Sequence, residues 1–266
     1  MRSIFQIAKY TFHEALRRRF MNVLLLFGVG LIAVLPLLAK WSPGAELNML
    51  TDWGLFFIRF FAILMAVLLG ATLIPTEIDK KTIHVLLAKP VNRVHILFGK
   101  LLGVFATVAT NIIVMGIVFM VVMLAKRSAF EGQTALNFLY SNLATALVLM
   151  LFEILVLTAL TIAVSTVSSW LFTAVFALSV YGAGQITASL GRLATPENYP
   201  QLPVRLLLKV VQVVIPHFED FDIRLPIMQG VEFQWWPLGI KIIGYALLYT
   251  AVVLGLGYLF FNEREV

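Results

Sequence analysis

Residues 55–93 read LFFIRFFAILMAVLLGATLIPTEIDKKTIHVLLAKPVNR, an apolar run followed directly by a charged segment. The apolar part, 55–75, is long enough to cross the hydrocarbon core of a bilayer, which takes about 20 residues of helix. The charged part opens with Thr76, which is followed three positions later by an acidic residue in the manner of a helix N-cap, and it closes at Pro90. The stretch therefore predicts a membrane span followed by a short surface helix at 77–88.

The surface helix presents an apolar tip, Leu86 and Leu87, among basic residues. One interpretation is a helix that is pushed by a partner protein at the membrane surface. The other is a loop helix that rests on lipid, with its lysine side chains extended toward water. The residues of the segment leave both interpretations open.

Composition assigns the chain to the all-α integral membrane proteins. Of the 266 residues, 61% are hydrophobic and 13% are charged, whereas about half of a soluble domain is apolar. The chain is therefore predicted to form one membrane domain, residues 1–266. Its six apolar runs predict six transmembrane helices: 20–39, 55–75, 101–125, 139–164, 171–188 and 238–261.

The distribution of basic residues predicts the orientation of these spans. With the N-terminus inside, more than half of the Lys and Arg residues fall in the inner segments, and an acidic cluster at 219–222 falls outside. Cytoplasmic segments carry such an excess of basic residues. Both termini and residues 76–100 are therefore predicted to be cytoplasmic, in a multi-pass protein of the cell (inner) membrane. The net charge of +6 is then a topology signal, and nucleic-acid binding is not implied.

Two further segments are predicted to lie at the membrane surfaces. Residues 1–19 place apolar side chains at helical spacing opposite a basic row, which predicts an amphipathic helix in the inner interface. Anchoring on anionic lipid and contact with a partner both remain open for this helix. On the outer side, 191–237 contains an apolar stretch, 203–215, that is only about 20 Å long as a helix and too short to span. It predicts an outer re-entrant or interfacial segment.

Motifs for enzyme chemistry are missing from the sequence. The chain has no GxxxxGK[ST], no HExxH and no GxSxG, so no catalytic residue is predicted and the chain is not expected to be an enzyme. HFEDFD at 217–222 could be drawn as a hard-cation site, but its carboxylates lack the spacing of a calcium loop. A solvated acidic loop is the preferred interpretation, and no metal site is predicted.

Polar residues inside the spans are the natural candidates for a pathway, because each is costly in lipid without a partner or a cavity. Glu153 lies deep in the fourth run, and Arg59 of the second run is its candidate partner. An ion pair, a protonated hydrogen-bonded glutamate and a direct transport role are the alternatives. Tyr181 and Gln185 form a polar pair in the fifth run. The third run carries a stripe at fourfold spacing, which predicts helix packing or the lining of a pathway: Gly99, Gly103, Thr107 and Asn111.

Two segments carry a resemblance to a known family: YTFHEALRRRF near the N-terminus and TEIDKKTIHVLLAKPVNRVHILFGK after the second run. With six spans, they resemble the ABC-2-type permeases, the membrane subunits of ATP-driven exporters. The N-terminal helix is most similar to the branch that includes permeases of nitrous-oxide-reductase maturation systems. The similarity is most specific in an ordered set of residues: Glu77, Thr82, Leu86, Leu87, Pro90, Val91, Arg93, Gly99 and Lys100. The glycine that commonly precedes the threonine is Lys81 here.

The resemblance implies a dimer, formed with a second copy or a paralogue, that works with separate ABC ATPase subunits in membrane lipid. ATP and Mg would bind to those ATPases, and no cofactor is expected in this chain. Residues 191–237 would hold the outer helices that close the exit. Residues 77–88 would be the coupling helix, with these positions at the ATPase contact: Glu77, Asp79, Thr82, Leu86, Leu87, Pro90 and Arg93. An ATP-independent channel or lipid scramblase, and an anchor subunit of a larger complex, remain the alternative functions.

Overall fold

The computed structural model describes residues 2–41, 45–79, 93–126, 133–187, 202–229, 233 and 235–263. This part of the chain contains helices and no strands, so the predicted all-α membrane fold is confirmed. Five described helices are long and apolar enough to cross a membrane: α2 (Arg19–Ala39), α3 (Glu46–Asp79), α5 (Arg93–Ala125), α6 (Gln133–Ser165) and α11 (Ile240–Glu263). The shorter elements are α1 (Arg2–Leu16), α7 (Trp170–Gly184), α9 (Leu202–Val214), the 3₁₀ helix η2 (Phe218–Phe221), α10 (Arg224–Met228) and the short π-helix η3 (Trp235–Gly239).

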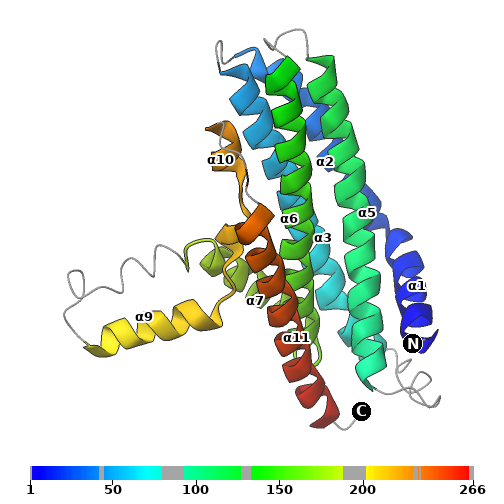
Figure 1. Cartoon of the computed structure of the whole chain (residues 1–266). Helices are drawn as coiled ribbons and strands as arrows, with labels where there is room; N and C mark the ends of the chain where they lie inside the picture. Colours follow the sequence, from blue (N-terminus) through cyan, green and yellow to red (C-terminus); the bar gives the residue numbers. More distant parts are fainter. Residues whose placement is uncertain are drawn as a thin grey trace.

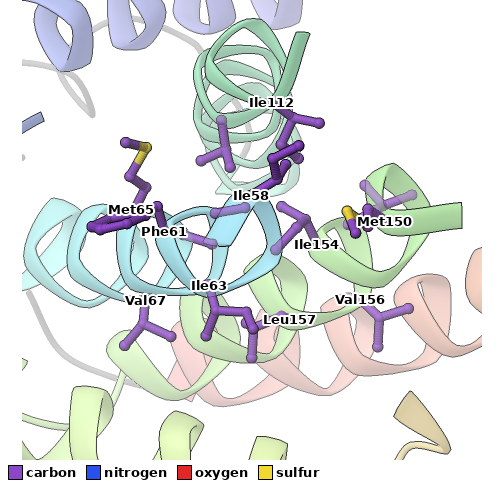
Figure 2. Close-up of a cluster of buried hydrophobic side chains, with 14 of the residues drawn as sticks. Ile58, Phe61, Ile63, Met65, Val67, Ile112, Met150, Ile154, Val156 and Leu157 are labelled. Atoms are coloured by element: carbon purple, nitrogen blue, oxygen red, sulfur yellow. The ribbon is translucent and has the colours of Figure 1, made fainter. Parts of the chain in front are cut away.

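Helices α3 and α6 form the centre of the bundle. In their most apolar windows 72% of the residues are buried, against 22% to 39% for α2, α5 and α11. Helices α2 and α5 pack on α3, and α11 packs on α6, while α9 extends away from the bundle (Figure 1). Ile58 of α3 meets Ile112 of α5 and Ile154 of α6 in one buried apolar cluster (Figure 2). Burial of such side chains is the main term that holds the described helices together.

The fifth span is shorter than the sequence predicts. The apolar run covers 171–188, whereas α7 ends at Gly184 and has 15 residues. A helix of that length is about 22 Å long, and the hydrocarbon core is about 30 Å thick. Helix α7 therefore covers only part of the height of the bundle, and its C-terminal end lies among the other helices.

The surface helix does not begin at Thr76, so this prediction is wrong. Helix α3 continues through Thr76 to Asp79, and the Thr76 hydroxyl donates a hydrogen bond to the carbonyl oxygen of Thr72 in the preceding turn. A hydroxyl that bonds back to residue i−4 belongs to a helix interior and caps nothing. Glu77 and Asp79 therefore form the last turn of α3, and Arg93 begins α5. The remaining predicted coupling positions lie outside the described residues: Thr82, Leu86, Leu87 and Pro90.

Helix α1 packs along α5 over the stripe of small residues. A Cβ atom added at Gly99 would lie 2.7 Å from the Cβ atom of Ile7, and one added at Gly103 would lie 2.6 Å from that of Thr11. Glycine is needed at both positions because the two backbones approach so closely. The apolar face of α1, predicted to face the membrane interface, is therefore covered in part by α5. Helix α1 ends at Leu16, and α2 follows almost at once, as predicted.

We expect Gly103→Leu to displace α1 from α5. A Cβ atom at this position would lie 2.8 Å from the carbonyl oxygen of Ala8, and a backbone atom cannot rotate away as a side chain can. Overpacking of this kind costs about 1–3 kcal/mol. The measurement is maleimide labelling of Thr11→Cys, whose native side chain is 3% exposed, and we expect labelling about tenfold faster. Gly30→Leu is the matched control, since no atom lies within 4 Å of a Cβ added there. Equal labelling rates in the two variants would contradict the packing.

Candidate functional site

A buried ion pair lies between the two central helices. Arg59 of α3 and Glu153 of α6 approach to 3.1 Å between Nε and Oε2, and they are 5% and 0% exposed. These two atoms are close but not aligned for a hydrogen bond with each other or with another described residue. The attraction is therefore mainly coulombic, and it is strong in a dry interior. Of the alternatives predicted for Glu153, the structure supports the ion pair.

The ion pair is level with the middle of α2. Gly28 stands near the midpoint of this helix, and a Cβ atom added there would lie 3.0 Å from a ring carbon of Phe61. Phe61 is two residues from Arg59 on α3. Since α2 has 21 residues, it is about 31 Å long, close to the thickness of the hydrocarbon core. Arg59 and Glu153 therefore lie near the midplane of a membrane spanned by α2.

The C-terminal end of α7 contributes two hydrogen bonds to Glu153. The Tyr181 hydroxyl donates to Oε1 at 3.1 Å, and the Gln185 Nε2 donates to the same oxygen at 3.4 Å. Helix α7 can supply both groups because it ends at this level of the bundle. The predicted polar pair of the fifth run thus belongs to the same site as Glu153 and Arg59.

Asp222 joins the site from a segment distant in sequence. It lies between η2 and α10, and its Oδ2 contacts Nη1 of Arg59. Nη2 of Arg59 donates to the carbonyl oxygen of Phe221 at 3.2 Å, so each of the three guanidinium nitrogens lies close to an oxygen atom. The prediction of a solvated acidic loop at 217–222 is therefore wrong for Asp222, because Arg59 pairs with it inside the bundle.

Arg224 continues this series of alternating positive and negative side chains toward the N-terminal end of α3. Its Nη2 contacts Asp222 Oδ2 at 2.8 Å, and its Nη1 contacts Asp52 Oδ1 at 3.2 Å. Side-chain exposure rises along the series, from 0% for the glutamate to 42% for Asp52. We call the set the charge row: Asp52, Arg224, Asp222, Arg59 and Glu153.

The carboxyl group of Asp222 is held in its charged form. Burial alone would raise its pKa, but the hydrogen bonds from Arg224 and the charge of Arg59 outweigh burial and hold the pKa below its ordinary value. Asp222 is therefore an anion at neutral pH and attracts both guanidinium groups.

Thr107 and Asn111, the other predicted pathway residues, are not part of the charge row. Both are buried, and each bonds to a carbonyl oxygen of its own helix, α5: Thr107 to Gly103 at 2.8 Å and Asn111 to Thr107 at 2.9 Å. Their stripe serves packing in the described part of the chain. Within the same residues, no group of three His, Asp or Glu side chains is placed to hold a metal ion.

Sequence reasoning missed Asp52, Arg224 and Asp222 as members of the site. Asp52 precedes the second apolar run and Arg224 lies in the outer segment, so both read as solvated residues. One signal was available: Asp222 and Arg224 are two residues apart, and a guanidinium at that distance can fold back on the carboxylate. The structure contains this bond, from Arg224 Nε to Asp222 Oδ1 at 3.1 Å.

Comparison with protein families places nearly the whole chain in a known family. A protein-family model described as "ABC-2 family transporter protein" matches residues 3–266, which is nearly the whole chain. No curated protein matches it.

Proposed function

This chain belongs to the ABC-2 family of transporter proteins, and on that premise we propose that it is the permease subunit of an ATP-driven exporter. The observation that carries the proposal is the family match over residues 3–266. Membership makes the chain a multi-pass membrane subunit of an ABC transporter, with five long apolar helices among the described residues. Export, the dimer and the coupling to a separate ATPase belong to the proposal. The similarity to nitrous-oxide-reductase maturation permeases stays a prediction.

In the proposal, ATP and Mg bind to two separate ABC ATPase subunits, and two permease subunits form the path between them. The segment 77–88 docks on the ATPase and receives its motion. The first three residues of this segment form the last turn of α3, which ends at Asp79, and α5 begins a few residues beyond the segment, at Arg93. A push on the segment would therefore act directly on α3, which carries Arg59.

The η2–α10 segment, residues 218–228, closes the outer side of the path in this proposal. Its contacts support the role, because Asp222 and Arg224 bind α3 at two different heights, through Arg59 and through Asp52. Seven residues of helix separate those two positions, about 10 Å along α3. The segment is therefore held over that length and could open as a unit.

The test is purification of the chain with the ABC ATPase encoded beside it. We expect a stable complex whose ATP hydrolysis is faster than that of the ATPase alone. A channel or scramblase would instead move ions or lipid in proteoliposomes that contain only this chain. Such activity, together with failure to form any complex with the ATPase, would overturn the proposal.

We propose that the N-terminus is cytoplasmic, and labelling of the cysteine-free chain tests this orientation. Arg17 and Lys40 are both exposed and flank α2 on opposite ends. On intact cells, a membrane-impermeant maleimide should label Lys40→Cys, because the excess of basic residues retains the other end inside. Arg17→Cys should label only after the membrane is opened. The reverse result would invert the topology.

A further inference from the structure

We propose that Arg59 is a shared latch, for which Asp222 of the η2–α10 segment and Glu153 of α6 compete. Neutralising Glu153 then holds the segment more tightly closed. The inference rests on the proposed function, in which this segment must leave the bundle for the path to open.

Contacts around the charge row are of three kinds. Arg59 and Glu153 join α3 to α6, the two central helices. Arg224 and Asp222 join residues within the η2–α10 segment, through bonds of 2.8 to 3.1 Å. Three other polar contacts cross from this segment to α3: Asp222 to Arg59, the Phe221 carbonyl to Arg59, and Arg224 to Asp52. Opening of the segment must break these three contacts.

Separation of the η2–α10 segment from α3 leaves no buried charge without a partner. Asp222 leaves together with Arg224, and Arg59 stays with Glu153, so each of these four charges keeps a partner of opposite sign. Asp52 loses Arg224, but its side chain is 42% exposed and needs no partner. This matters because a buried charge that loses its partner is strongly destabilising. The arrangement therefore permits the segment to open and close without leaving an unpaired charge in the membrane interior.

The negative charge of Glu153 lowers the energetic cost of opening the η2–α10 segment. With Glu153 ionised, Arg59 has a second anion that compensates it when Asp222 departs. With Glu153 neutral, Arg59 would be left as an uncompensated cation near the midplane. In the closed arrangement, loss of the Glu153 charge also removes its repulsion of Asp222. Both effects favour the closed state, so the two carboxylates have opposite effects on the latch.

The test is maleimide labelling of Ile223→Cys, a position between Asp222 and Arg224 that is 5% exposed. The protein is placed in lipid nanodiscs, where reagent reaches both faces and orientation does not matter. We expect Asp222→Asn to accelerate labelling about ten- to hundredfold, because a charge-assisted contact to Arg59 is lost. We expect Glu153→Gln to slow labelling below the rate of the parent.

Asp220→Asn is the matched control. It makes the same chemical change two residues away, at an exposed side chain in η2, and should alter the rate by no more than about twofold. The slowing in Glu153→Gln separates the latch from general loosening, since a destabilised bundle would label faster. Acceleration in Glu153→Gln, or an unchanged rate in Asp222→Asn, would overturn the inference.

Ile227→Cys, in α10 and 6% exposed, serves as a second reporter and should follow the same pattern. The labelling requires no ATPase, so its result is independent of the test of the proposed function. Expected labelling with no ATPase complex would overturn the function alone. A stimulated ATPase with unaltered labelling would overturn the latch alone.

Discussion

Leu86→Asp combined with Leu87→Asp will give a permease that inserts normally but no longer retains its ATPase on purification. In the proposed complex, each leucine buries most of its side chain in a cleft of the ATPase, which is worth about 1.5–3 kcal/mol. Loss of both, in an additive estimate, weakens docking by several orders of magnitude, because about 1.4 kcal/mol is a factor of ten. Insertion survives because no residue of a predicted span changes. Copurification and ATP hydrolysis are the measurements.

Trp41→Asp is the control for the added charge. Trp41 is an 84% exposed apolar residue just beyond the C-terminal end of α2, whereas Arg18, at the other end of that helix, bonds Thr72 near the C-terminal end of α3. We expect this variant to keep its ATPase and its stimulated hydrolysis. Full stimulation in the double leucine variant would show that the coupling assignment is wrong, and the lipid-resting interpretation of 77–88 would replace it.

Arg59→Gln will destabilise the protein by about 3–5 kcal/mol, because it leaves the fully buried Glu153 without its cation. Glu153→Gln will destabilise the protein clearly less, since Arg59 keeps Asp222 and the Phe221 carbonyl as partners. The asymmetry follows from the number of partners that each side chain retains. Thermal unfolding in detergent, followed by intrinsic tryptophan fluorescence, measures both variants.

The double variant, Arg59→Gln with Glu153→Gln, should be more stable than Arg59→Gln alone, because no charge is then left unpaired at the position of Glu153. A coupling energy of about 0.5–3 kcal/mol is expected for two residues in contact. Arg17→Gln removes an exposed arginine and is expected to have little effect. Additive effects of the two substitutions, with no coupling, would eliminate the ion pair.

Features that depend on local composition were predictable from the sequence. An apolar run of sufficient length has few alternatives to a membrane helix, because every backbone polar group must be bonded in lipid. The membrane class and α1 followed from such patterns. Thr76 is an exception: its spacing to Asp79 is that of an N-cap, but the helix that begins at Glu46 continues through it. The spacing of two residues does not indicate whether a helix that began earlier in the chain continues through them.

By itself, then, the sequence determined that this is an all-α membrane protein with long apolar helices, and it singled out Arg59, Glu153, Tyr181 and Gln185 as polar residues in need of partners. Only the tertiary structure decided which partners they have. Arg224 and Asp52 meet across 172 positions of sequence, and Arg59 meets the Phe221 carbonyl across 162. Hydrophobic periodicity records which face of one helix is apolar, whereas an ion pair depends on how separate elements stack in height and rotation. That stacking joined two carboxylates to one guanidinium at the level of the middle of α2.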